Sequence, residues 1–385
     1  MHQRVNVKTK REAANYSIRI GVDLLDQVAK WASELLGPRC KIAIISNKKV
    51  FGFYGQQIAN SLNAAGFTTE VHLIGDGEHF KNLKSLMGVL DSLSSFGISR
   101  SDAVLGLGGG VVGDLAAFAA SIHLRGVDYL SVPTTLLSMV DSSVGGKTGI
   151  NTEFGKNQVG TFFQPKGVLI DPKVLVSLPK REMTAGFCEC IKQAAISGNS
   201  MLRRTRSVIE QVGESKFSKL LQNNDFTEKL EEILALQVAF KAKIVAGDER
   251  ESIQKTDSRS RKILNFGHTF AHALEKATDY SYLKHGEAVG YGIIFASALS
   301  EKLGLLDMEV VNLLRDVVHR AGILPSIFSV DSKLVFEALR HDKKVIGSDL
   351  QWVLLKGIGN PAIVPHNEIG DRLVFSTIKE FTTAN

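Results

Sequence analysis

The segment DAVLGLGGGVVGDLAAFAA, residues 102–120, decides the fold class. The apolar run at 103–107 is typical of a buried strand, and a helical pattern at 115–120 follows the glycine-rich turn at 108–113. Backbone N–H groups at such a helix start can cradle a phosphate. The turn matches G-x-G-x-x-G, but a standard dinucleotide fingerprint opens its domain and has an acid at the end of the next strand. Here the turn lies about a hundred residues into the chain and the next strand ends at Pro133-Thr134-Thr135, so nucleotide binding and a tight strand-to-helix turn both stay open.

Short β-branched runs alternate with helical patterns around this segment. Strands are predicted at 41–46, 69–74, 102–107, 129–132 and 168–171, with helices at 22–36, 51–65 and 82–96. Such alternation predicts a Rossmann-like parallel sheet with helices on both faces. After Pro179 helices are predicted at 226–246, 264–277, 287–303 and 308–321, with a hairpin around 352–364. We therefore expect an α/β N-terminal domain at 1–178, a mainly α-helical C-terminal domain at 179–385, and an active site in the cleft between them.

The amino-acid composition argues against a membrane protein, a secreted disulfide-rich protein and a nucleic-acid-binding protein. Of the 385 residues 44% are hydrophobic, yet no apolar run approaches the roughly 18 residues of a membrane helix, so we expect a soluble protein without a membrane partner. Three cysteines are too few for a disulfide framework, and residues 1–11 do not resemble a secretory signal, which indicates the reducing cytoplasm. The 46 basic residues are interspersed with 40 acidic ones, so the basic cluster at 203–206 favours a solvated helix face over nucleic-acid binding. The net charge of +6 suits a small anionic substrate equally well.

Two further glycine-containing stretches carry candidate ligand groups. Residues 140–151, VDSSVGGKTGIN, continue into Gly155-Lys156-Asn157, and their lysines, asparagine and glycines predict an anion pocket. The alternative is a flexible glycine-rich surface loop. The Lys-Thr-Gly portion also occurs in penicillin-recognising enzymes, but the chain lacks their S-D-N element. The turn Gly75-Asp76-Gly77-Glu78, followed by Lys81, places acids that could hold ribose hydroxyls, although alone it indicates only a loop.

A histidine cluster indicates a metal site. His268 and His272 are four residues apart, which places both imidazoles on one face of a helix, and His285 follows after a short loop. A carboxylate is expected to complete the site, and Glu189 on a predicted helix is a candidate. The two cysteines that flank Glu189 are two residues apart and point to nearly opposite sides of a helix, so we interpret them as small core residues.

Together these motifs resemble the 3-dehydroquinate synthase family of the sugar phosphate cyclase superfamily, over residues 44–357. The most specific matches are, in the family's order, the stretches 108–114, 125–126, 133–151, 155–157, 264–272 and 285–289. The resemblance implies a dehydroquinate synthase-like fold, a homodimer, an anionic sugar phosphate substrate, NAD as cofactor and zinc as metal, with cobalt as an alternative.

The resemblance also implies roles for individual residues. The zinc ligands are implied to be Glu189, His268 and His285, whereas His272, despite its spacing, is implied to lie beside the substrate. The residues implied to hold NAD are Asp76, Glu78, Lys81, Gly108, Gly109, Gly110, Asp114, Thr134, Thr135, Asp141, Lys147 and Lys156. The residues implied to contact the substrate and to act in catalysis are Arg125, Lys147, Asn157, Lys192, Lys241, Arg261, Asn265 and His272.

The implied reaction converts 3-deoxy-D-arabino-heptulosonate 7-phosphate to 3-dehydroquinate and phosphate. Zinc acidifies the hydroxyl at carbon 5, NAD⁺ removes hydride there, and the resulting ketone makes the neighbouring proton removable. Phosphate leaves, the bound NADH returns its hydride, the ring opens, and an intramolecular aldol step closes the carbocycle. NAD is therefore catalytic and is not consumed.

Two departures from the family pattern affect these assignments. Segment 252–260 is several residues longer than expected before Arg261, so the alignment of Lys241 and Arg261 needs structural support. Cysteines on both sides of Glu189 are also unusual for the family.

Three alternatives share parts of the pattern. Cyclases that form valiolone-type or inosose-type rings have the same fold, NAD and zinc, but 141–147 and Asn265 resemble the dehydroquinate branch. Glycerol and iron-containing alcohol dehydrogenases have a similar two-domain plan and release NADH, whereas the pocket of Lys147, Lys156 and Asn157 favours a phosphorylated acid. A non-enzymatic sensor derived from the fold would not need intact metal and cofactor motifs.

Overall fold

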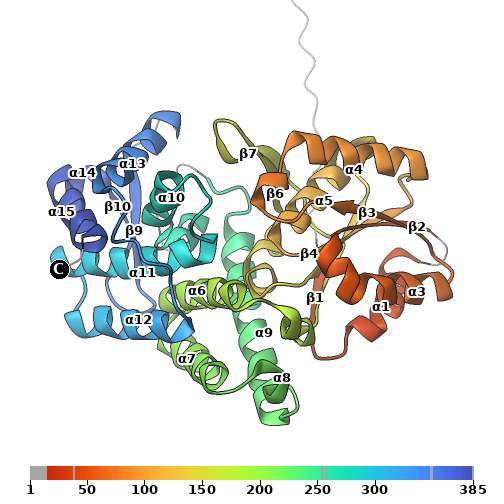
Figure 1. The fold of residues 1–385 in the computed structure, drawn as a ribbon, viewed down its shortest axis with the longest axis horizontal. Coiled ribbons are helices and arrows are strands. Elements are labelled where there is room, and N and C mark those ends of the chain that lie inside the picture. Colours follow the sequence, from red (N-terminus) through yellow and green to blue (C-terminus); the bar gives the residue numbers. More distant parts are fainter. Residues whose placement is uncertain are drawn as a thin grey trace, which may run out of the picture.

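A six-stranded parallel sheet forms the N-terminal half of the computed structural model, which describes residues 15–37, 40–252, 255, 257, 259–346 and 350–383. The strand order is β1-β8-β5-β4-β2-β3 (Figure 1). The strands are β1 Ser17–Ile20, β2 Lys41–Asn47, β3 Thr68–Ile74, β4 Ala103–Gly108, β5 Asp128–Pro133 and β8 Gly167–Ile170. The sequence pattern predicts all of these except β1.

Alternate residues of β2 face two separate apolar clusters. Ile42 and Ile44 share a cluster with α1 and α3, whereas Ala43 and Ile45 share a cluster with α4 and α5. This period of two belongs to a strand that is buried on both faces, so helices cover both faces of the sheet as predicted. These helices are α1 Val28–Leu36, α3 Gln56–Ala64, α4 Leu83–Phe96 and α5 Gly110–Ile122, with the short α2 Lys48–Val50 after β2.

The chain after Leu178 folds mainly into helices, which lie beside the sheet (Figure 1). The fold class predicted from the sequence is therefore confirmed. No helix within the described ranges has the length and apolarity that crossing a bilayer requires. The elements are α6 Lys180–Ser197, α7 Asn199–Glu214, α8 Phe217–Leu220, α9 Asn224–Gly247, α10 His268–Ala277, α11 His285–Lys302, α12 Met308–Ala321, α13 Ser332–Ile346, the hairpin β9 Gln351–Leu355 and β10 Pro361–Pro365, α14 His366–Ile369 and α15 Asp371–Thr382.

Two predicted helices begin later than their apolar pattern. The helix expected at 22–36 begins at Val28, after a short 3-10 turn at Leu25–Gln27. The helix expected at 264–277 begins at His268, because Gly267 adopts a left-handed backbone with φ of 80° that interrupts the helix. His268 is therefore the first residue of α10 rather than a residue of its interior.

The glycine-rich stretch 147–162 forms an antiparallel hairpin of β6 Lys147–Thr152 and β7 Gly155–Phe162, which replaces the flexible loop considered from the sequence. A Cβ at Gly160 would lie 1.9 Å from the Thr148 carbonyl oxygen, so the two strands approach more closely than a side chain permits. The Asn151 backbone N–H donates to the Lys81 carbonyl at 2.8 Å. This bond fixes the hairpin beside the turn that follows β3.

Helices that carry predicted metal ligands also approach one another through glycines. A Cβ at Gly292 of α11 would lie 2.0 Å from the Gly267 carbonyl oxygen, immediately before α10. A Cβ at Gly286 of α11 would lie 2.1 Å from the Ala185 carbonyl oxygen of α6. Backbones in such contact leave no room for a side chain. These glycines therefore set the spacing of α6, α10 and α11.

We expect Gly292→Ala to lower the free energy of unfolding by about 1–3 kcal/mol or more, because its Cβ would overlap backbone that cannot move aside. Gly213→Ala is the matched control, since Gly213 is an exposed helical glycine with no heavy atom within 4 Å of its Cβ position. This control should gain about 0.5–1 kcal/mol. Urea denaturation measures both changes. Equal stability of the Gly292→Ala variant and the parent would contradict the close approach.

Candidate active site

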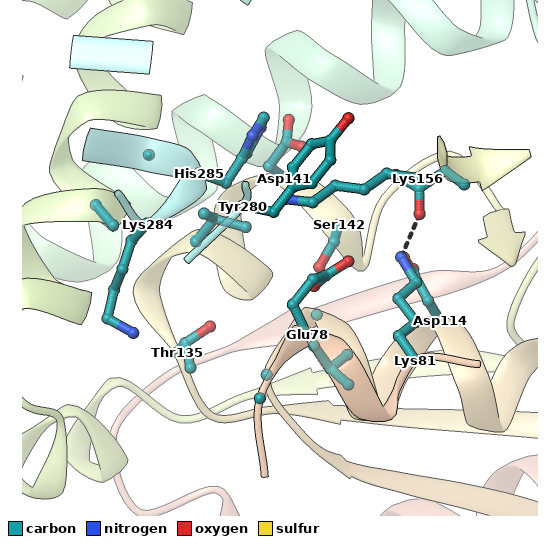
Figure 2. Close-up of a pocket in the computed structure, with 18 of the residues that line it drawn as sticks. Glu78, Lys81, Asp114, Thr135, Asp141, Ser142, Lys156, Tyr280, Lys284 and His285 are labelled. Carbon is teal, nitrogen blue, oxygen red and sulfur yellow. Dashed lines mark hydrogen bonds and ion pairs between the residues drawn. The ribbon is translucent and has the colours of Figure 1, made fainter. Parts of the chain in front are cut away.

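A cavity of about 1290 Å³ lies where the carboxyl ends of β2, β3, β4 and β5 meet helices α6, α10 and α11. Ligands of open α/β sheets bind at this edge. In Figure 2, Glu78 and Thr135 from the sheet side face His285 and Lys284 from the helical side. The volume exceeds the roughly 300–1,000 Å³ of an ordinary small-molecule pocket. A dinucleotide and a second small ligand therefore fit together.

The sheet side offers groups that suit a dinucleotide. No side chain caps the N-terminus of α5, and its first residues line the cavity. A Cβ at Gly109 would lie 2.9 Å from Cγ2 of Thr135, so a larger residue would require the Thr135 side chain to shift. Lys81 forms an ion pair with Asp114 and donates to Oδ1 of Asn157, which links the turn after β3, α5 and the β6–β7 hairpin. The backbone can thus approach a phosphate, and a lysine is held beside it.

Most residues predicted to hold NAD line this cavity. Gly108 does not; it lies at a separate void of about 20 Å³, where a Cβ would be 2.6 Å from the Val112 side chain. Asn47, which the sequence analysis did not single out, donates to Oδ1 of Asp76 at 3.2 Å. The predicted residues on the cavity wall are Asp76, Glu78, Lys81, Gly109, Gly110, Asp114, Thr134, Thr135, Asp141, Lys147 and Lys156.

Three helices bring the predicted metal ligands together. Glu189 lies on α6, and its Oε1 is 3.7 Å from Nε2 of His268 and 3.6 Å from Nε2 of His285, the first residues of α10 and α11. A nitrogen of His272 also lies within 4.8 Å of nitrogens of the other two histidines. The structure thus assembles one carboxylate and three imidazoles, which is a donor set typical of zinc.

The donor set fits a cation because one oxygen of its carboxylate, Oε1, has no partner other than the histidines among the described residues. Glu189 is fully buried and neither oxygen accepts a hydrogen bond within the described residues, although Lys192 Nζ forms an ion pair with Oε2 at 2.6 Å. Burial, together with nearby Lys192, holds the pKa of His268 well below its ordinary value, so its imidazole is neutral. Neutral imidazole and ionised carboxylate are the forms that bind metal.

A second charged network lies between this cluster and the sheet. Nζ of Lys241 donates to Oδ1 of Asp141 at 2.8 Å, and Nζ of Lys192 lies 3.8 Å from the same oxygen. Burial lowers the pKa of Lys241, although Asp141 opposes this effect. Burial also disfavours charge on Lys192, but Glu189 and Asp141 raise its pKa above the ordinary value. Two neighbouring lysines thus have opposite tendencies to release a proton, which suits acid–base chemistry.

The structure places both residues of uncertain alignment, Lys241 and Arg261, on the cavity wall. Nη1 of Arg261 donates to the Gly145 carbonyl at 3.1 Å and to the Glu249 carbonyl at 2.8 Å. The Asp248 carboxylate accepts the Arg261 backbone N–H at 2.9 Å. The longer segment before Arg261 therefore does not displace it from the site.

A carboxylate of the chain itself occupies the predicted anion pocket. Glu251 forms an ion pair with Lys147 and accepts a hydrogen bond from Nδ2 of Asn265 at 3.0 Å. Burial raises the pKa of Glu251, but Lys147 and Asn265 reverse this effect and lower it. Glu251 therefore holds negative charge where two predicted substrate contacts converge.

Arg125 lies away from this cavity. It follows α5 at the end opposite Gly109, about 20 Å along a helix of 13 residues, and its side chain is exposed. The backbone there is left-handed, with φ of 50° at Leu124 and 69° at Arg125. Substrate contact by Arg125 remains a prediction, because Arg125 does not line the cavity of its own chain.

Four other predicted site residues lie behind the cavity wall rather than on it: Asn265, Lys192, Glu189 and His268.

Sequence reasoning missed Glu275. It is 1% exposed, and its carboxylate contacts Nδ1 of His285 at 3.1 Å and Nζ of Lys156 at 2.7 Å. Burial raises the pKa of Glu275, but His285 and Lys156 hold it well below its ordinary range. Glu275 lies three and seven residues after His272 and His268, so helical periodicity could have placed it on the same face.

A parallel sheet joined to a helical half, with a carboxylate and histidines beside a dinucleotide-sized cavity, defines the class of dehydroquinate synthase-like cyclases. Family models described as 3-dehydroquinate synthase N-terminal and C-terminal match residues 71–185 and 186–345. The 3-dehydroquinate synthase of Lactococcus lactis subsp. cremoris (strain MG1363) is 38% identical over 366 residues, which cover 95% of this chain and 96% of that protein. The chain belongs to the 3-dehydroquinate synthase family.

Solved structures of other cyclases share the fold. The 2-epi-5-epi-valiolone synthase ValA from Streptomyces hygroscopicus subsp. jinggangensis 5008, solved with NAD⁺ and Zn²⁺ bound, has a TM-score of 0.83 and 27% identity over 98% of this chain and 99% of that chain. A 2-deoxy-scyllo-inosose synthase complexed with carbaglucose-6-phosphate, NAD⁺ and Co²⁺ has a TM-score of 0.77 at 24% identity, covering 94% of this chain and 96% of that one. The second likeness concerns the fold alone.

We expect Glu251→Gln to tighten the binding of inorganic phosphate roughly fivefold or more in the presence of saturating NAD⁺. The amide keeps the shape of the side chain and removes a carboxylate that competes with an anion for Lys147, an effect on the order of 1 kcal/mol. Titration calorimetry measures the dissociation constant. Glu249→Gln, at an exposed carboxylate two residues earlier, should stay within about twofold of the parent. Unchanged or weaker phosphate binding by Glu251→Gln would show that this carboxylate does not compete.

Proposed function

We propose that the chain catalyses the 3-dehydroquinate synthase reaction, converting 3-deoxy-D-arabino-heptulosonate 7-phosphate to 3-dehydroquinate and phosphate. The observation that carries the proposal is family membership across 95% of the chain, with Glu189, His268 and His285 meeting beside a dinucleotide-sized cavity. The enzyme is thus a carbon–oxygen lyase. The identity of 38% to a dehydroquinate synthase, against 27% to the valiolone synthase, favours this substrate over a sugar phosphate without a carboxylate.

NAD fits the sheet side of the cavity. The uncapped start of α5 suits a pyrophosphate, and Asp76 and Glu78 suit ribose hydroxyls. When bound, NAD⁺ supplies an acceptor for the hydride of carbon 5 and later returns that hydride. The valiolone synthase relative, solved with NAD⁺ bound, supports this assignment.

Zinc fits the cluster of Glu189, His268 and His285, because Oε1 of the buried carboxylate faces both histidines and accepts no hydrogen bond within the described residues. When bound, zinc supplies a Lewis acid that lowers the pKa of the substrate hydroxyl. Lys192 forms an ion pair with Oε2 of Glu189, the carboxylate oxygen that does not face the histidines. This ion pair restrains the orientation of the Glu189 side chain. His272 faces the cavity one turn after His268, where it can exchange a proton with a substrate hydroxyl.

The substrate's anionic groups would meet the basic groups around the hairpin. Lys147 and Asn265 converge on the space that Glu251 now occupies, and Arg261 lies on the same wall. Lys241, held by Asp141, lies between this region and the metal cluster. These groups bind and orient the substrate.

We also propose a domain boundary at 178/179 and a homodimer. The sheet ends with β8 and α6 begins at Lys180, close to the junction of the two family models. Arg125, exposed and outside its own cavity, could meet a substrate only in the site of a second copy or after a large movement. In a homodimer, Arg125 of one copy would be able to reach the site of the other copy.

The closed redox cycle gives the test of the reaction. We expect a catalytic quantity of NAD⁺ to support many turnovers, with phosphate and 3-dehydroquinate formed in equal amounts and no build-up of NADH absorbance. A dehydrogenase would consume NAD⁺ stoichiometrically and release no phosphate. A cyclase of another branch would prefer sedoheptulose 7-phosphate or glucose 6-phosphate as substrate. Either of these outcomes would overturn the proposed reaction.

The metal assignment has its own test. We expect His285→Ala to lower bound zinc well below stoichiometric while the circular dichroism signal of the helices survives, because the variant removes a ligand at the first residue of α11. His319→Ala, at an exposed histidine of α12, should keep full zinc. Metal analysis of both dialysed variants makes the comparison. Full zinc in His285→Ala would refute the ligand assignment.

A further inference from the structure

His285 is held from both sides of its ring. Nε2 faces Oε1 of Glu189 at 3.6 Å, within the proposed metal cluster. Nδ1 faces Oε2 of Glu275 at 3.1 Å, on the opposite side of the ring. An ionised carboxylate accepts hydrogen bonds but has no hydrogen to donate, so Nδ1 of His285 must carry the hydrogen of this contact. When the ring is neutral, which is the form that binds metal, its lone pair then lies on Nε2, which points at Glu189.

Glu275 is itself restrained. Its second oxygen, Oε1, accepts from Nζ of Lys156 at 2.7 Å, and the side chain is 1% exposed. Lys156 extends from β7 across the face of Tyr280, with Nζ 4.5 Å from the ring centroid (Figure 2). With one oxygen on each partner, the carboxylate cannot rotate away from His285 without breaking the bond to Lys156.

A nearby buried carboxylate, Glu287, has a purely structural role that differs from the role of Glu275. Glu287, two residues after His285, directs both oxygens to the Arg181 guanidinium at 2.7 and 2.6 Å and accepts the Lys284 backbone N–H at 2.8 Å. These contacts cap α11 and tie it to α6. Glu275 instead reaches from α10 to the ring of a proposed metal ligand, and neither of its oxygens caps a helix.

We propose that Glu275 is a positioning residue that fixes the tautomer and ring orientation of His285 for metal binding through Nε2, with Lys156 restraining Glu275. The inference rests on the proposed metal cluster of Glu189, His268 and His285. Partners of this kind, behind a ligating histidine, typically change metal affinity by about 10–100-fold when they are removed. Glu275 therefore acts on the reaction through His285 without contacting the reacting atoms.

The first experiment measures zinc affinity by competition with a chelator in Glu275→Gln. We expect about 10–100-fold weaker zinc binding, because the amide keeps the shape of the side chain but loses the charge that favours hydrogen on Nδ1. The visible spectrum of the cobalt-loaded protein should also change, since the ring orientation alters the ligand field. Lys156→Met removes only the restraint on Glu275 and leaves the contact with His285, so it should weaken zinc binding by less than Glu275→Gln does.

The second experiment needs no variant that could misfold. In zinc-loaded parent protein with ¹⁵N-labelled histidine, we expect the His285 ring, assigned by difference from His285→Ala, to carry hydrogen on Nδ1. Hydrogen on Nε2 would overturn the inference. So would parent-like zinc affinity and cobalt spectrum in Glu275→Gln, or equal losses in Glu275→Gln and Lys156→Met. Failure of the parent to bind zinc, or of His285→Ala to lose it, would instead refute the metal cluster itself.

Discussion

The carboxylate of Glu189 is fully buried and accepts no hydrogen bond in the described structure, with Lys192 as its neighbouring cation. An ionised group costs several kcal/mol to bury unless its charge is balanced. One lysine three residues away on the same helix balances the charge but leaves the second oxygen facing His268 and His285. The negative potential at that oxygen is what suits the cluster to the proposed metal ion.

The same constraint extends from the helices to the sheet. Lys192 lies between Glu189 and Asp141, and Asp141 in turn holds Lys241. Asp141 belongs to a single π-helical turn, Ser138–Ser142, a feature that is frequent at functional sites. Because neutralising one member would leave its neighbour unpaired, the four charges act as a unit across the two halves of the chain. The glycines that let α11 approach α6 and α10 make this arrangement sterically accessible.

Periodicity in the sequence was enough to place the central strands, since strands buried on both faces form continuous apolar runs such as residues 103–107. It did not find β1, an edge strand of the sheet, or the β6–β7 hairpin, whose glycines allow close strand contact but carry no strand propensity. The sequence pattern grouped His268, His272 and His285 and offered Glu189 as the carboxylate, while the family resemblance moved His272 from the metal to the substrate. The structure brings all four side chains together.

Contacts between distant segments explain what the sequence could not supply. Glu275 meets Lys156 across 119 positions of the chain, and Glu251 meets Lys147 across 104. Neither glutamate belongs to a motif that implies a ligand. Arg125 is the converse case: its motif implies substrate contact, but α5 carries it away from the cavity of its own chain, so the contact stays a prediction.

The pairing of cavity lysines with carboxylates also explains why net charge carried so little information. Lys81, Lys147 and Lys156 have Asp114, Glu251 and Glu275 as partners, in addition to the pairs around Asp141. An anionic ligand must therefore exchange internal ion pairs for its own, so its affinity reflects a difference between two sets of contacts rather than attraction to an open positive patch. Because of this exchange, a ligand whose charges match the lysine positions binds tightly, whereas a ligand that is anionic but has its charges elsewhere binds weakly. Selectivity for a particular sugar phosphate thus follows from where each lysine is held, and the carboxylates that hold the lysines are part of the recognition surface.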